Sequence, residues 1–120
     1  LGHVDLIAKF NGDGTFFDDE DPRYRAAALE ALHAADPGEP LLEINTGAMA
    51  RGYRSVPYPA LFLLREWRDM GGKIILTADA HSAGTIVHGY AQAAALARAA
   101  GFERSTLLTR RGREERPLEL

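Results

Sequence analysis

The sequence predicts an α/β fold in which parallel strands alternate with helices. The segment Lys73–Thr77 (KIILT) has an unbroken apolar centre, which is typical of a strand buried on both faces of a sheet. Segments before and after it carry apolar residues at helical spacing, and strand and helix signals alternate along the chain. This alternation is typical of βα units, whose strands lie parallel in one sheet.

The first half of the chain predicts a helix and a strand after an opening apolar stretch. Pro22 fits the first turn of the helix, and Asp21 before it fits the N-cap. Apolar residues then repeat at helical spacing at Tyr24, Ala28, Leu29 and Leu32. The expected elements are the end of a strand in residues 1–10, a loop over 11–21, a helix from 22 to about 35, a strand over 41–46 and a loop over 47–57.

The second half predicts two more helices and two more strands. Leu63, Trp67 and Met70 stand at positions i, i+4 and i+7 of a helix that follows Pro59, and Gly101 closes the later, alanine-rich helix. The expected elements are a helix from 60 to 70, a strand over 73–77, a helix over 83–100, a strand over 105–109 and a charged, solvated tail from Arg110.

The composition restricts the class of protein. A hydrophobic content of 46% argues against a disordered chain, and a net charge of -3 gives no electrostatic footprint for nucleic-acid binding. Cysteine is absent, so any metal ligands are His, Asp or Glu. No apolar run is long enough for a membrane span, and the cytoplasm is the expected compartment. Because the chain opens at Leu1, apparently at the end of a strand, we expect it to be the C-terminal half of a larger α/β fold.

The clearest chemical signal is the segment Thr77-Ala78-Asp79-Ala80-His81 at the end of the apolar strand. Asp79 and His81 are two residues apart, so in an extended segment their side chains point to the same side. Parallel α/β folds place their sites at the carboxyl ends of strands, and a carboxylate with an imidazole suits a divalent transition metal. The alternative is a polar loop in which Asp79 caps the following helix.

Three further acidic or imidazole side chains are candidates. His3 follows what looks like a strand end and is either a ligand or a hydrogen-bonded structural residue. Asp5 either orients an imidazole or is simply solvated. Glu43 lies in the middle of the expected strand LLEINT, where an ionised carboxylate is costly unless it is paired, functional or on a wet face.

Arg51 and Arg54 lie in the loop that follows the same strand. An arginine there can hold a phosphate through paired charge-assisted hydrogen bonds, or can be an ordinary surface residue. Gly47 lets this loop approach a ligand closely. Tyr58 either lines a pocket or packs the loop.

Four motifs in this order resemble the C-terminal half of the polymerase and histidinol phosphatase (PHP) superfamily, and most of all its histidinol-phosphate phosphatase branch. The motifs are Gly2-His3-Val4-Asp5-Leu6-Ile7, Leu42-Glu43-Ile44-Asn45-Thr46-Gly47 with Arg51-Gly52, Pro57-Tyr58-Pro59, and Asp79-Ala80-His81-Ser82. The resemblance covers nearly the whole chain. It implies that residues 1–120 are the C-terminal part of one PHP metallophosphoesterase domain, a distorted (β/α)7 barrel resembling a TIM barrel.

The resemblance also implies roles for individual residues. His3, Asp79 and His81 would be metal ligands, Asp79 and His81 would be the catalytic residues, and Arg51 would bind the substrate phosphate. The complete domain would hold up to three divalent transition metals, whether Zn, Mn or Fe. The family's His-x-His pair and bridging glutamate precede the Gly-His-x-Asp element and are not in this sequence. We therefore expect the fragment alone to be inactive.

These implications predict a phosphatase, with L-histidinol phosphate as the expected substrate and histidine biosynthesis as its pathway. The partner is then a small-molecule phosphate ester, with no nucleic acid and no membrane. Two alternatives stay open: a PHP phosphoesterase with another substrate, and a non-catalytic α/β module. An open half-barrel would expose strand edges, which favours a homo-oligomer or association with the missing N-terminal part.

Overall fold

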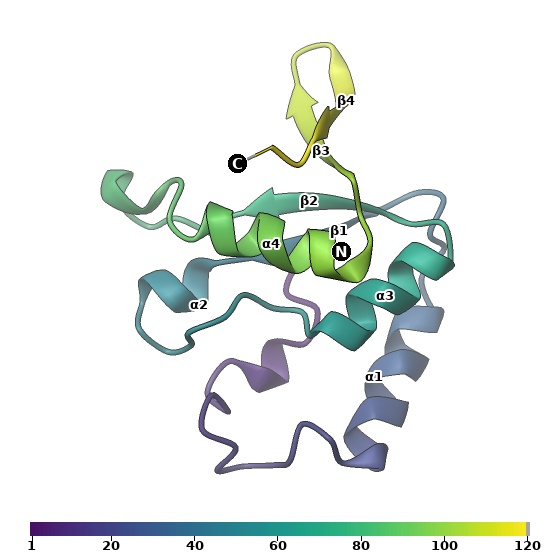
Figure 1. Cartoon of the computed structure of the whole chain (residues 1–120), viewed down its shortest axis with the longest axis vertical. Helices are drawn as coiled ribbons and strands as arrows, with labels where there is room; N and C mark the ends of the chain where they lie inside the picture. Colours follow the sequence, from purple (N-terminus) through teal and green to yellow (C-terminus); the bar gives the residue numbers. More distant parts are fainter. Residues whose placement is uncertain (120) are drawn as a thin grey trace.

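The computed structural model describes residues 1–119. It contains two small sheets, four α-helices and two short 3-10 helices (Figure 1). The elements in chain order are η1 (Leu6–Ala8), α1 (Pro22–His33), β1 (Leu41–Asn45), α2 (Gly47–Ala50), α3 (Leu61–Asp69), β2 (Lys73–Thr77), η2 (Ala83–Thr85), α4 (Tyr90–Ala100), β3 (Arg104–Thr109) and β4 (Gly112–Pro117). Among these residues, no helix has the length and apolar character needed to cross a membrane.

The strands β1 and β2 form the parallel pair that the sequence predicts. Leu41 lies opposite Lys73 at one end and Asn45 lies opposite Thr77 at the other, without a bulge. The chain between them passes through α3, as a parallel connection requires. Both strands therefore end at the same edge, and the segments that follow them emerge side by side.

The outer edge of β1 is occupied by backbone from two other segments. The nitrogen of Leu1 donates to the carbonyl oxygen of Leu41 (2.7 Å), and the nitrogen of Glu43 donates to the carbonyl oxygen of Leu1 (3.0 Å). Further along, Asn45 and Tyr58 exchange two backbone hydrogen bonds in an antiparallel bridge. The strand end expected in residues 1–10 is therefore wrong: within residues 1–119 no strand precedes β1, and the segment pairs with β1 only through Leu1 before it forms η1.

The expected portion of a distorted (β/α)7 barrel is wrong. Within residues 1–119, β3 pairs antiparallel with β4 in a separate two-stranded sheet, and no hydrogen-bonded ladder joins β3 to β2 (Figure 1). The physical reason lies in the tail that was expected to be solvated. Gly112, with φ of +108°, reverses the chain after Thr109, and the charged strand that follows supplies the hydrogen bonds of β3. Of this tail, Leu120 lies outside the described residues.

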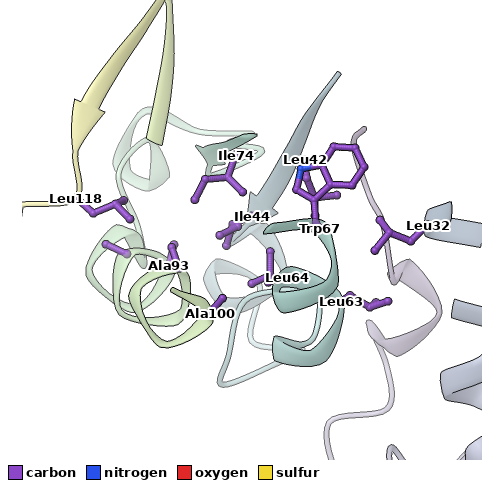
Figure 2. Close-up of a cluster of buried hydrophobic side chains, with 12 residues drawn as sticks. Leu32, Leu42, Ile44, Leu63, Leu64, Trp67, Ile74, Ala93, Ala100 and Leu118 are labelled. Atoms are coloured by element: carbon purple, nitrogen blue, oxygen red, sulfur yellow. The ribbon is translucent and has the colours of Figure 1, made fainter. Parts of the chain in front are cut away.

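The main hydrophobic core lies between the β1–β2 sheet and the helices α3 and α4 (Figure 2). Leu42, Ile44 and Ile74 point from the strands into this core and are buried. Four fully buried alanines of α4 allow that helix to approach the sheet closely: Ala93, Ala94, Ala97 and Ala100. The expectation that β2 is buried on both faces is only partly met, because Ile75 on its other face is only half-buried.

Trp67 is the largest side chain of this core and is completely buried. Its indole nitrogen donates to the carbonyl oxygen of Lys73 (2.9 Å), so it ties α3 to the start of β2. Gly72 lies against the ring, because a Cβ there would stand 2.2 Å from Trp67 Cε2. The Gly-Gly stop that the sequence places after α3 therefore also makes room for the indole.

The helix starts show where sequence signals are sufficient. The Asp21 side chain accepts from the Arg23 backbone nitrogen, which confirms the predicted N-cap of α1. The helix expected over residues 83–100 instead begins at Tyr90, because Gly89 before it has φ of +74°. The short helix α2 replaces the start of the loop expected over residues 47–57.

The Asp21 cap predicts an acid-dependent loss of stability. The guanidinium and the backbone nitrogen of Arg23 donate to this carboxylate and lower its pKa from 3.8 to about 2. A depressed folded-state pKa contributes stability that is present above pH 3.8 and is lost as the pH falls toward about 2. Asp21→Ser keeps a capping oxygen without the charge. Urea midpoints measured over this range should fall further for the wild-type chain than for the variant; equal falls would refute the ionised cap.

Candidate functional site

Side chains from four segments line a cavity of about 400 Å³ beyond the carboxyl ends of β1 and β2. Asp79 and His81 follow β2, and Arg51 follows β1 through α2. His3 enters from the N-terminal segment, and Tyr58 enters from the segment paired with the end of β1. The structure therefore brings together all four site residues that the sequence predicts, which are His3, Arg51, Asp79 and His81.

His3 and Asp79 contact each other in the wall of this cavity. His3 Nε2 lies 3.3 Å from Asp79 Oδ2, although the two residues are 76 positions apart in the chain. Both have left-handed backbone conformations, with φ of +57° at His3 and +46° at Asp79. Histidine and aspartate adopt this conformation more readily than most non-glycine residues, and Asp5, outside the cavity, has φ of +68°.

Glu43 positions His3 and is itself fully paired. Its Oε2 accepts a hydrogen bond from the backbone nitrogen of His3 (2.7 Å), and its Oε1 accepts one from the hydroxyl of Thr77 (2.7 Å). The side chain is only 14% exposed. Of the readings open at the sequence level, pairing is the correct one: this carboxylate joins β1, β2 and the N-terminal segment.

Arg51 carries the guanidinium of the cavity. Its Nη1 lies 3.1 Å from His81 Nδ1 and donates to the carbonyl oxygen of Asp79 (3.3 Å), while its Nη2 lies 3.5 Å from Asp79 Oδ2. Gly47 makes this approach possible, because a Cβ there would stand 2.9 Å from Arg51 Nη2 and 3.0 Å from the carbonyl oxygen of Ala78. The guanidinium thus lies beside one imidazole and one carboxylate, and its planar group of donors can bind an anion.

Arg54 and Asp5, by contrast, serve the surrounding structure. Arg54 donates to the carbonyl oxygen of Ala8 and so turns away from the cavity. Asp5 makes no bond to an imidazole: it accepts from the hydroxyl of Tyr24 (2.5 Å) and from the backbone nitrogen of Ala60 (3.0 Å). Burial is the main cause that raises the pKa of Asp5. Asp5 thus joins the N-terminal segment to α1 and to the start of α3, and Arg54 joins it to the loop that follows α2.

Tyr58 and Lys9 complete the cavity wall. Tyr58 is 1% exposed, and burial, followed by the charges of Asp79 and Glu43, raises the pKa of its hydroxyl. Of the two sequence-level readings of Tyr58, lining a pocket is confirmed. Lys9 also lines the cavity, with its Nζ 5.2 Å from the Tyr53 ring centroid, although the sequence does not predict it. The residue follows the short helix η1, whose turn has no recognisable periodic pattern in the sequence.

The donors of this cavity fit a divalent metal only in part. Two ligands at about 2.1 Å from one zinc ion, at the tetrahedral angle, lie roughly 3.4 Å apart, close to the separation of His3 Nε2 and Asp79 Oδ2. Within residues 1–119, however, no three His, Asp or Glu side chains are grouped as a metal site. His81 Nδ1 is directed to Arg51 and to the Asp79 carbonyl oxygen (2.8 Å). The described residues thus supply a pair of ligands and not a complete site.

Comparison with known proteins gives no assignment for this cavity. No family model matches the sequence, and no curated protein matches it either. The function must therefore be inferred from the side chains that meet in the cavity and from the motifs that carry them.

Proposed function

We propose that this chain forms part of a phosphatase of the PHP superfamily, which hydrolyses a phosphate monoester to an alcohol and inorganic phosphate. The observation that carries the proposal is that His3, Arg51 and Asp79 meet in one cavity beyond the carboxyl ends of β1 and β2. The motif resemblance adds L-histidinol phosphate as the substrate, and a cytoplasmic location is part of the proposal.

The charges of the cavity suit a phosphate group. Arg51 and Lys9 contribute two cations, and the Arg51 side chain is 31% exposed, so a ligand can reach it. A planar guanidinium binds two phosphate oxygens at once, which fixes the orientation of the group as well as its position. The Asp79 carboxylate would repel the same phosphate unless a cation lies between them.

Each residue then has a distinct part in the reaction. Arg51 binds the phosphate oxygens and offsets the charge that moves onto them as the ester bond breaks. His81, beside Arg51, can give a proton to the departing alkoxide. His3 and Asp79 would hold a divalent metal, which lowers the pKa of a bound water and so supplies hydroxide near neutral pH. Further ligands would come from other polypeptide, either an N-terminal part or a second copy.

A second candidate is a non-catalytic α/β module that binds a phosphate group without hydrolysing it. The incomplete ligand set of the described residues favours this reading. The two candidates share the anion-binding role of Arg51 and differ in whether the protein turns substrate over.

The test is hydrolysis of L-histidinol phosphate by the full-length, metal-loaded protein and its Arg51→Gln variant. A hydrogen bond to a charged group contributes about 1.5–3 kcal/mol, so the variant should lose about tenfold to a hundredfold in kcat/KM. Arg110→Gln, on the exposed turn between β3 and β4, is the matched control and should behave as the wild type. If phosphate is released from another monoester in a panel but not from histidinol phosphate, the phosphatase function stands and the substrate is that other monoester. No release from any monoester would favour the module.

A further inference from the structure

The hydroxyl of Tyr58 is a buried polar group without a partner. The residue is 1% exposed and lines the cavity, yet its hydroxyl forms no hydrogen bond to any residue between 1 and 119. Asn45 is completely buried, and its Nδ2 is also without a partner among these residues. Because an unpaired buried donor is costly, native proteins keep few of them, and those they keep call for an explanation.

The backbone places these two groups together. Asn45 donates to the carbonyl oxygen of Tyr58 (2.8 Å), and Tyr58 donates to the carbonyl oxygen of Asn45 (3.2 Å). Two residues that exchange both bonds in an antiparallel pair have their side chains on the same face. The two unpartnered donors therefore lie on one side of the β1 edge.

Arg51 lies next to this pair. The position that a Cβ would take at Gly47 is 2.9 Å from Arg51 Nη2 and 3.0 Å from Asn45 Oδ1, so the guanidinium and the amide flank the same point. Tyr58 and Arg51 both line the cavity. The Tyr58 hydroxyl is therefore an unpartnered donor in the wall of the cavity that contains the guanidinium.

We propose that the Tyr58 hydroxyl donates a hydrogen bond to an oxygen of the phosphate group that Arg51 binds. The inference rests on the phosphate site of the proposed function and adds a residue that selects tetrahedral oxyanions by geometry as well as by charge. It explains why a polar group is kept unpaired in the cavity wall: its partner is the ligand. The amide of Asn45 is a second unpartnered donor on the same face.

The test measures the affinity of the chain for inorganic phosphate by calorimetry, together with its thermal midpoint. Tyr58→Phe should weaken phosphate binding by about tenfold, because it removes a hydrogen bond to a charged group. Its thermal midpoint without phosphate should be unchanged or higher, since removing an unpaired buried hydroxyl removes a desolvation cost. Tyr90→Phe is the matched control, because the Tyr90 hydroxyl makes only a long contact with the Leu76 carbonyl oxygen (3.5 Å).

Three outcomes would overturn the inference: no phosphate binding by the wild-type chain, equal affinities for wild type and Tyr58→Phe, or an affinity loss matched by a large fall in thermal midpoint. The last would mean that Tyr58 supports the fold and does not touch the ligand. If the Tyr58→Phe variant hydrolyses the substrate as fast as the wild type, Tyr58 has no role and the proposed function stands. If phosphate binding depends on Tyr58 but no monoester is hydrolysed, the role of Tyr58 stands and the phosphatase function is wrong.

Discussion

Asp79→Asn should abolish most of the proposed phosphatase activity of the full-length protein, with a fall of about 10²–10³ in kcat/KM. The substitution removes the negative charge that faces His3 Nε2 and keeps the size of the side chain. Asparagine also tolerates the left-handed backbone of residue 79 (φ +46°) better than most residues, so the local structure should persist. The measurement is steady-state hydrolysis, with circular dichroism to show that the fold is retained.

The matched control for this prediction is Asp69→Asn. Asp69 ends α3 away from the cavity, and its side chain is 62% exposed. The Asp69→Asn variant should therefore have the same kcat/KM as the wild type. If both variants keep full activity, the facing pair His3–Asp79 has no part in the reaction, and the proposed site is wrong.

Trp67→Ala should be the most destabilising substitution among the core residues. Replacing a fully buried tryptophan by alanine costs about 3–5 kcal/mol in free energy of unfolding, from lost apolar burial and the cavity left behind. The bond from its indole nitrogen to Lys73 is lost as well. Since a domain of this size is stable by about 5–15 kcal/mol, the variant should unfold at a much lower urea concentration.

Circular dichroism is the suitable probe for this loss, because Trp67 is the single tryptophan of the chain and its fluorescence disappears with the substitution. Phe16→Ala is the control, because its aromatic ring is 73% exposed. That variant should stay within about 0.5 kcal/mol of the wild type. Similar urea midpoints for the two variants would show that the core is not centred on Trp67.

The elements that the sequence predicts well are those specified by local signals. The cap at Asp21, the helical spacing around Trp67 and the apolar centre of Lys73–Thr77 each have a direct physical meaning, and each element forms where expected. The start of α4 was missed because its determinant is a single positive φ at Gly89. The barrel expectation failed for a different reason: the partner of β3 depends on a turn at Gly112 and on a strand too charged to show a strand pattern.

The site shows the same division. That Asp79, His81 and Arg51 meet follows from the rule that parallel strands end at one edge, and the structure agrees with it. The pairing of Glu43 with the backbone of His3 could not be predicted, because it depends on a contact between residues 40 positions apart. The sequence likewise could not show that the Tyr58 hydroxyl lacks a hydrogen-bond partner, because this depends on the positions of all the segments packed around it.

Titration of the ¹⁵N-labelled chain with inorganic phosphate tests most directly whether the cavity between His3, Arg51 and Asp79 binds a phosphate group. We expect the amide shifts to change most at His3, in residues 47–53 and in residues 77–82, around the cavity wall. A basic surface elsewhere offers the contrast: Arg68, Lys73 and Arg104 line a separate hollow, where Lys73 is paired with Glu115. Shift changes centred on that surface, or none at all, would show that the cavity does not bind phosphate.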